Sequence, residues 1–283
     1  MTRGWLSGPL AVALGLFAVT PTRGVDAPRS TARAAQFQAI QAEWKAAEQA
    51  CEKAVETVQT EAEAQRIYET QYPDTLAFSR RMLDLAAAGP GDEPARDALL
   101  WVLERSLHLA GPGPFVDLEA RAGTMLLEHH ADDSEVARMA LDLSRGPSRN
   151  RDVLLVGLAA KARGPEAKGL ARLALAKYSA AKAETAERLG TADGERLAKY
   201  YGEPYAAQLR ACDPAALRRE AERLCDRVIA DSGDVRCYTR RDRQMGEFLR
   251  ANPPAEATDP EEKRQLLAAE RRVARRNTFA QSL

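Results

Sequence analysis

Glycine and proline interrupt most of this 283-residue chain at short intervals, and this punctuation is the feature that most restricts its fold. Proline stops a helix and glycine is a weak helix former, so each interruption is expected to end one helix and to form the turn that precedes the next helix. The pattern therefore predicts short helices joined by tight turns. The breaks predicted from Gly and Pro are 89–91, 111–114, 146–147 and 164–165, and Ala131-Asp132-Asp133 is predicted to form a further break at 131–133.

Helix-favouring composition and apolar spacing indicate an all-α fold. Ala, Leu, Glu and Arg dominate, aromatic residues make up 6% of the chain, and no run of alternating apolar and polar residues predicts a strand. A long first helix is expected over 31–58, because apolar residues recur there at steps of three and four. These residues are Phe37, Ile40, Trp44, Ala47, Cys51, Ala54 and Val58. We predict stacked helical hairpins over 31–251, solenoid-like in the manner of TPR or HEAT proteins, as a single domain.

Local signals predict where several helices begin. Thr60 with Glu63 three residues later forms a capping-box pattern, which satisfies free N–H groups at a helix start. Asp74 follows Tyr72-Pro73 and is placed to cap the next helix. Asp213 before Pro214 predicts a helix to Ile229, with Leu217, Ala221, Leu224, Cys225 and Val228 on its buried face. A longer Ala-rich helix is expected from Gly164 to Leu189, and a last one over 240–250.

The N-terminus resembles a secretory signal peptide over 1–27. Arg3 precedes an apolar stretch from Leu6 to Val19, which is shorter than the roughly 20 residues that a membrane span needs. Small residues between 24 and 34 offer cleavage points. The alternative is an uncleaved anchor. Both interpretations place the body of the protein outside the cytoplasm, in the periplasm or cell envelope.

The C-terminal part is expected to be separate from the helical domain. Its Pro- and Ala-rich residues 252–258 are typical of a linker. Residues 259–283 are predicted to form a charged helix or tail that becomes basic from Arg271 to Arg276. A solvated tail and a docking helix for an acidic partner are both consistent with this composition.

The charge balance and the absence of catalytic motifs exclude several functions. Lys plus Arg and Asp plus Glu each number 41, so no broad positive field favours nucleic acid. We find no nucleotide-binding loop, Gly-x-Ser-x-Gly, His-Glu-x-x-His or Cys-x-x-Cys sequence, so we predict no enzyme and no cofactor. His129-His130 with Asp132-Asp133 contains metal-ligand types. However, adjacent histidines on a helix diverge by about 100°, so we expect a structural role and no metal.

The cysteines are the remaining candidates for chemistry. Cys51 and Cys225 lie on apolar stripes, where a free cysteine behaves as a small hydrophobic residue. Cys212 and Cys237 flank the helix that begins after Asp213. A disulfide or redox role for Cys212, Cys225 and Cys237 stays open, with Cys225–Cys237 requiring less folding back of the chain than Cys212–Cys237.

Three stretches resemble the N-terminal helical region of exported bacterial thioredoxin-like proteins (redoxins, thiol-disulfide oxidoreductases). They are IYETQYPD after the first helix, DEPARDALLWVLERS, and GEPYAAQLRACDPAALRREAERLCDRVIADSGDV from Gly202. The likeness covers about 35–250. In such proteins a thioredoxin domain with a Cys-x-x-Cys pair follows, whereas 251–283 contain no such pair. The resemblance therefore implies an envelope location and a redox neighbourhood. It does not imply oxidoreductase activity.

Together these observations predict a non-catalytic exported scaffold that binds another envelope protein, with a thioredoxin-like protein among the candidates. The alternative is an accessory protein of thiol-disulfide exchange that uses Cys212, Cys225 or Cys237. Arg210, Arg236 and Arg240 lie near these cysteines in the sequence and would favour a thiolate.

Overall fold

The computed structural model describes residues 26–107 and 113–232, and within these ranges every regular element is an α-helix. The helices, in chain order, are α1 (Asp26–Glu56), α2 (Glu61–Gln71), α3 (Thr75–Ala87), α4 (Glu93–Ser106), α5 (Phe115–His129), α6 (Ser134–Leu143), α7 (Arg149–Lys161), α8 (Pro165–Arg188), α9 (Gly194–Tyr201), α10 (Glu203–Arg210) and α11 (Pro214–Ser232). The predicted all-α class is confirmed.

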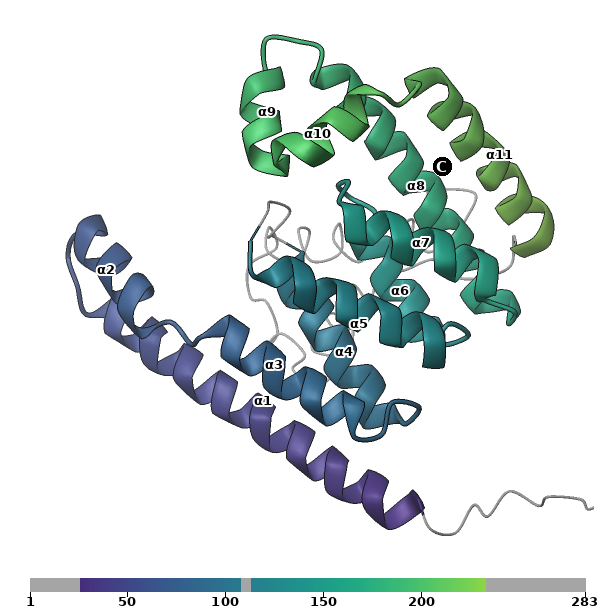
Figure 1. The fold of residues 1–283 in the computed structure, drawn as a ribbon. Helices are drawn as coiled ribbons and strands as arrows, with labels where there is room; N and C mark the ends of the chain where they lie inside the picture. The colour runs from purple at the N-terminus through teal and green to yellow at the C-terminus, as the bar shows by residue number, and fades with distance from the viewer. Residues whose placement is uncertain (1–25, 108–112, 233–283) are drawn as a thin grey trace, which may run out of the picture.

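The helices stack in two layers. One layer holds α3, α5 and α7, which contact one another in that order, and the other holds α4, α6 and α8 (Figure 1). α11 packs along α8, and α1 lies across α3 and α4 at the opposite end. Across the layers α3 pairs with α4, and α7 pairs with α8. The predicted all-α fold of packed helical hairpins is confirmed. Burying one face of each hairpin against the next is what stabilises such a stack.

The core runs between the two layers from α1 to α8. Its largest fully buried side chains come from both layers, and they are Met82, Leu83, Leu99, Leu100, Leu103, Leu126, Met139, Leu143, Leu155, Leu158 and Tyr178. A smaller cluster joins the end of α8 to α9 and α10. α6 is the most enclosed helix, because every residue from Val136 to Leu143 is buried.

Helix starts follow the local signals in the sequence. The Thr60 hydroxyl accepts a hydrogen bond from the Glu63 backbone N–H at 3.3 Å, and Asp74 accepts from two N–H groups at the start of α3. Asp213 Oδ1 accepts from the Ala215 N–H at 2.9 Å, and Pro214 is the first residue of α11. Within the described residues, the predicted breaks fall between helices, except that Pro165 is the first residue of α8. Gly111 and Pro112 of one break lie outside them.

Several boundaries differ from the prediction. α1 runs from Asp26 to Glu56, where 31–58 was expected, and α11 continues to Ser232, beyond the expected Ile229. A break at Gly202 was missed, and it separates α9 from α10 with backbone angles of φ 80° and ψ 133°. Residues other than glycine rarely adopt such a positive φ.

Several predicted segments fall where the structure gives no description. They are the signal segment up to Val25, the helix over 240–250, the linker 252–258 and the tail 259–283. Across 26–107 and 113–232, no helix combines the length and apolar character that a membrane span requires.

Candidate functional site

The C-terminal half of α1 and the whole of α2 form an arm that projects from the stack. Figure 1 shows α2 lying beyond the layers, alongside the end of α1, and among the described helices α1 is its main contact. No residue of α2 is buried, although the helix has 11 residues. A short helix that buries so little gains little stability from packing, so its exposed surface calls for an explanation beyond folding. We call residues 43–74 the α1–α2 arm.

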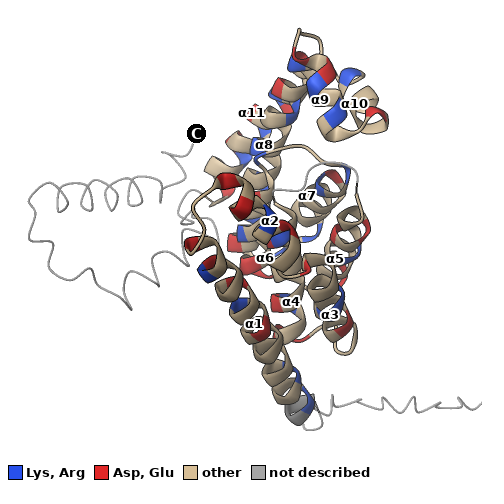
Figure 2. Ribbon diagram, turned by 90° about the vertical axis from the view of Figure 1, so that its left-hand side faces the viewer, with Lys and Arg blue, Asp and Glu red and all other residues tan. Residues whose placement is uncertain are grey.

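The arm is acidic and carries exposed tyrosines. It contains eight Asp and Glu residues and three Lys and Arg residues, so its formal charge is −5 in a chain whose net charge is zero. Acidic residues lie along both of its helices (Figure 2). Tyr68 and Tyr72 are 44% and 42% exposed, with ring centroids 6.3 Å apart. Tyrosine is enriched at protein–protein interfaces whereas Asp and Glu are depleted there, so the two tyrosines are the part of this surface that most favours a protein partner.

The arm is attached to the stack through Trp44. Its indole is 3% exposed and makes edge-to-face contacts with Tyr72, Phe78 and Trp101 at centroid distances of 5.7, 5.3 and 5.2 Å. A second attachment is the ion pair between Arg81 Nη1 and Glu43 Oε2, at 2.6 Å, which lowers the pKa of Glu43. Four elements therefore meet at Trp44, and they fix the direction in which the arm leaves the body.

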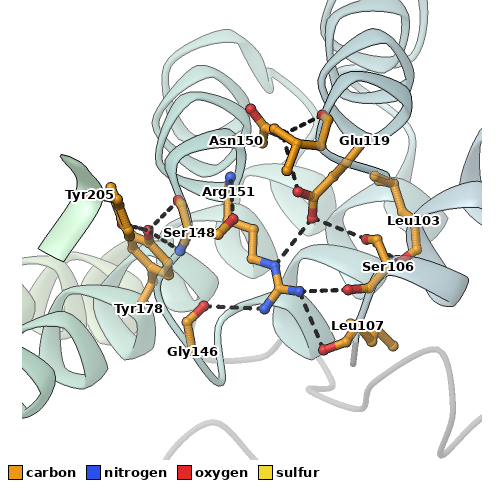
Figure 3. Close-up of polar contacts among 11 residues, drawn as sticks. Leu103, Ser106, Leu107, Glu119, Gly146, Ser148, Asn150, Arg151, Tyr178 and Tyr205 are labelled. Carbon is orange, nitrogen blue, oxygen red and sulfur yellow. Dashed lines mark hydrogen bonds and ion pairs between the residues drawn. The ribbon is translucent and has the colours of Figure 1, made fainter. Parts of the chain in front are cut away.

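A buried polar network lies at the start of α7 (Figure 3). The Arg151 side chain donates through Nε to Glu119 Oε1 at 3.3 Å and through Nη2 to the backbone carbonyls of Ser106 and Leu107 at 3.0 and 3.3 Å. Arg151 and Glu119 are 3% and 6% exposed. Glu119 also accepts hydrogen bonds from Ser106 Oγ at 3.0 Å and from Asn150 Nδ2 at 3.2 Å. Arg151 thus closes the C-terminal end of α4 and joins it to α5 and α7.

A second polar chain runs from the same turn to α8 and α10. Tyr178 donates to the Ser148 carbonyl at 2.9 Å, and its hydroxyl lies 3.2 Å from that of Tyr205. Tyr205 donates to Asp152 Oδ2 at 3.1 Å, and Lys182 Nζ donates to both oxygens of Asp152 at 2.9 Å. Burial raises the pKa of both tyrosines, so they stay protonated and serve as hydrogen-bond donors. The arrangement connects helices and offers no activated nucleophile among these residues.

The structure separates the cysteines that the sequence singled out. Cys51, Cys212 and Cys225 are free, and Cys237 lies outside the described residues. Cys212 precedes α11 and Cys225 lies in its middle, so the helical rise puts them more than about 15 Å apart. That is too far for a disulfide between them. Cys212 Sγ donates to the Gln208 carbonyl at 3.3 Å, and nearby Arg210 is paired with Glu203 at 2.5 Å.

Thiol alkylation of the native protein is expected to modify Cys212 before Cys225, and Cys225 before Cys51. Burial, followed by the charge of Asp226, raises the pKa of Cys225 and reduces its thiolate fraction. Cys51 is 1% exposed and cannot meet the reagent until the protein opens. Iodoacetamide labelling at pH 8 with mass-spectrometric mapping measures the order, and a urea-unfolded sample is the control. Faster reaction of Cys225 than of Cys212 in the native protein would contradict this order. Faster reaction of Cys225 in the native protein than in the unfolded sample would favour the redox alternative.

The two histidines have different surroundings. His130 is 8% exposed, and its Nε2–H donates to the Pro90 carbonyl at 2.7 Å, which ties the end of α5 to the turn between α3 and α4. His129 is exposed. Within 26–107 and 113–232, no group of three or more His, Cys, Asp or Glu residues could hold a metal ion. Asp132 accepts from the backbone N–H groups of Arg163 and Gly164, and so joins two turns on one side of the stack.

Acidification from pH 7.5 to 5.5 is expected to destabilise the protein through His130. Burial lowers its pKa below the usual 6.5, so the unfolded chain takes up a proton at a pH where the folded protein does not. Stability is therefore retained above about pH 6.5 and falls below it, by at most about 1.4 kcal/mol per pH unit. Urea unfolding at several pH values measures this slope. His130→Gln keeps an N–H donor and should remove the slope, whereas His129→Gln should leave it; equal slopes in all three proteins would refute the assignment.

Sequence reasoning missed the α1–α2 arm as a surface, although its acidic excess and the tyrosines of IYETQYPD were visible. It also missed Arg151 and Glu119.

Comparisons of the chain with protein-family models, with curated proteins and with solved structures find no match.

Proposed function

We propose that this protein is a non-catalytic exported scaffold of the cell envelope, and that its α1–α2 arm binds another envelope protein. The observation that carries the proposal is α2, a helix without a buried residue that is held away from the stack by α1. Its surface is available to a partner without any rearrangement of the core. The signal-peptide pattern at 1–27 supports an envelope location.

The chemistry of the arm indicates what kind of partner it takes. Its formal charge of −5 favours a basic surface, because opposite charges raise the rate of encounter and exclude like-charged competitors. Tyr68 and Tyr72 supply rigid aromatic contact area between the carboxylates. The ordered stack behind the arm presents it in one orientation, which lowers the entropy cost of binding.

Site-specific photocrosslinking tests the proposal in the cells that produce the protein. A photoreactive phenylalanine at position 68 is expected to yield a discrete crosslinked product in the envelope fraction. The same residue at position 121, an exposed arginine position on α5, is the matched control and should yield no such product. A thioredoxin-like protein is one candidate for the crosslinked partner. Identical products at both positions, or none at 68, would refute the arm as a binding surface.

The identified partner should then bind the purified protein saturably and without turnover. Charge reversal at Glu61 and Glu69, both exposed on α2, is expected to weaken this binding on the order of tenfold at low salt. The effect should shrink as salt is added, because exposed charges are screened. Unchanged affinity in the doubly reversed variant would count against recognition by charge.

A further inference from the structure

A groove runs between α1 and α3, which lie side by side (Figure 1). Its volume is about 350 Å³, which is within the range of pockets that bind small ligands. Ile40 and Leu85 form its floor, and each is 3% exposed. Ala39 and Ala88 line its two sides and are exposed, and their short side chains leave the groove open. The groove therefore presents an apolar surface that a ligand can reach from outside.

An ion pair between α1 and the stack lies at each end of the groove. At one end, Arg33 packs against Gly89, and its Nε donates to Asp92 Oδ2 at 2.6 Å. At the other end, Arg81 Nη1 pairs with Glu43 Oε2 at 2.6 Å. The helical rise from Arg33 to Glu43 puts the two ends about 15 Å apart. Both arginines are neutralised by these carboxylates, so neither contributes a free positive charge to the groove.

Asp84 is the unpaired charge between these two ends. It lines the groove, is exposed, and forms no ion pair within 26–107 and 113–232. Gln36 lines the groove from α1 and adds an amide oxygen that can accept a hydrogen bond. A carboxylate beside an apolar floor is complementary to a lysine or arginine side chain. The methylene groups of such a side chain pack on apolar surface, while its charged end stays at the polar edge.

We propose that this groove binds a lysine or arginine side chain of the protein that the α1–α2 arm binds. The methylene groups of that side chain pack on Ile40 and Leu85, and its cation lies at Asp84. The groove ends at Glu43, the first residue of the arm, so one partner can occupy both, and to that extent the site rests on the proposed function. The formal charge of −5 on the neighbouring arm favours a basic partner over a second copy of this chain.

Methyl NMR of the full chain, with n-butylammonium as the probe, tests the chemistry of the groove. At constant ionic strength the probe is expected to shift the methyl signals of Ile40 and Leu85 saturably. The signals of Leu155 and Leu158, which are fully buried in α7, should stay unchanged. 1-Butanol has the same apolar chain without the charge and should bind about threefold more weakly. Butyrate, which carries the opposite charge, should cause no saturable shift.

Two variants locate the bound probe. Asp84→Asn is expected to weaken binding of n-butylammonium about threefold, whereas Asp117→Asn, at an exposed position on α5, should retain it. Ala39→Leu fills the groove without changing its charge and should abolish the shift of Leu85. Ala46→Leu makes the same change at an exposed position on α1 outside the groove and should preserve that shift. The proposal is overturned by no saturable shift in the unmodified protein, by undiminished binding in both groove variants, or by equal binding of butyrate.

The partner crosslinked at position 68 separates the groove from the proposed function. Asp84→Asn should weaken binding of this partner about threefold and leave the crosslink at 68 detectable. Unchanged affinity in this variant would overturn the groove as part of the partner site, although the arm still binds. Absence of the crosslink would refute the proposed function and, with it, this source of the side chain, even where n-butylammonium binds.

One further variant tests the chain's own basic segment as the occupant. It carries Arg271→Gln, Arg272→Gln, Arg275→Gln and Arg276→Gln. Equal binding of n-butylammonium by this variant and by the unmodified protein is expected. Binding by the variant alone would assign the groove to residues 271–276 and would overturn the proposal.

Discussion

Replacement of Arg151 by methionine is expected to lower the free energy of unfolding by about 3–5 kcal/mol. Glu119 is only 6% exposed, and in the variant its carboxylate has no counter-ion. The variant also removes the donors to the last carbonyls of α4. A buried charge without a partner is far more costly than the pair is stabilising, because the remaining ion stays desolvated.

Urea unfolding followed by circular dichroism measures the loss for Arg151→Met. Arg149→Met is the matched control, because it makes the same change at an exposed position on the same helix and should alter stability by no more than about 0.5 kcal/mol. The double variant Glu119→Leu with Arg151→Met should recover part of the loss, since it removes both charges together. Similar stabilities of the Arg151 and Arg149 variants would show that Arg151 does not hold this network.

Replacement of Trp44 by alanine is expected to cost about 3–5 kcal/mol and to loosen the α1–α2 arm. The indole is 3% exposed and contacts Tyr72, Phe78 and Trp101, so its loss leaves a cavity at the junction of α1, α3 and α4. Because α2 has no buried residue of its own, the contact between Trp44 and Tyr72 is a main attachment of its C-terminal end.

Two measurements separate these effects of Trp44→Ala. Denaturant unfolding reports the global loss of stability. Hydrogen exchange over residues 60–72 reports the local loss, and Trp44→Ala is expected to speed exchange there more than it does in α7. Trp44→Phe retains an aromatic ring and should lose less stability. Tyr68→Ala removes an exposed aromatic from the same arm and should have little effect. A Trp44→Ala variant as stable as Tyr68→Ala would show that the aromatic cluster does not carry the attachment.

The sequence was informative about helix ends because those signals act over a few residues. Thr60, Asp74 and Asp213 each bond to backbone N–H groups two or three positions later, so their roles can be predicted without knowledge of the tertiary structure. The Gly-Pro turns are equally local. The repeated hairpins and their two-layer stack then follow from apolar stripes that need a neighbouring helix.

The buried network could not be predicted in the same way, because Arg151 and Glu119 are 32 residues apart in the sequence. Charged residues usually face solvent, so each alone suggests a surface position. One signal was present for both. Glu119 lies between Phe115 and Ala122 on the apolar stripe of α5, and Arg151 precedes Leu154, Leu155 and Leu158 on that of α7. A charged residue at apolar spacing indicates a buried partner, but it does not identify the partner.

The first turn of α7 also has a mechanical consequence. Apolar contacts between stacked helices are non-directional and tolerate small shifts. A solenoid whose repeats contact only their neighbours through such contacts can therefore bend. Hydrogen bonds are directional and weaken steeply when misaligned. Residues 148–152 form hydrogen bonds with α4, α5, α8 and α10, and therefore fix the relative positions of these helices in the middle of the stack. A force applied at the α1–α2 arm should thus deform the junction around Trp44 first, while the half of the molecule beyond α7 keeps its shape.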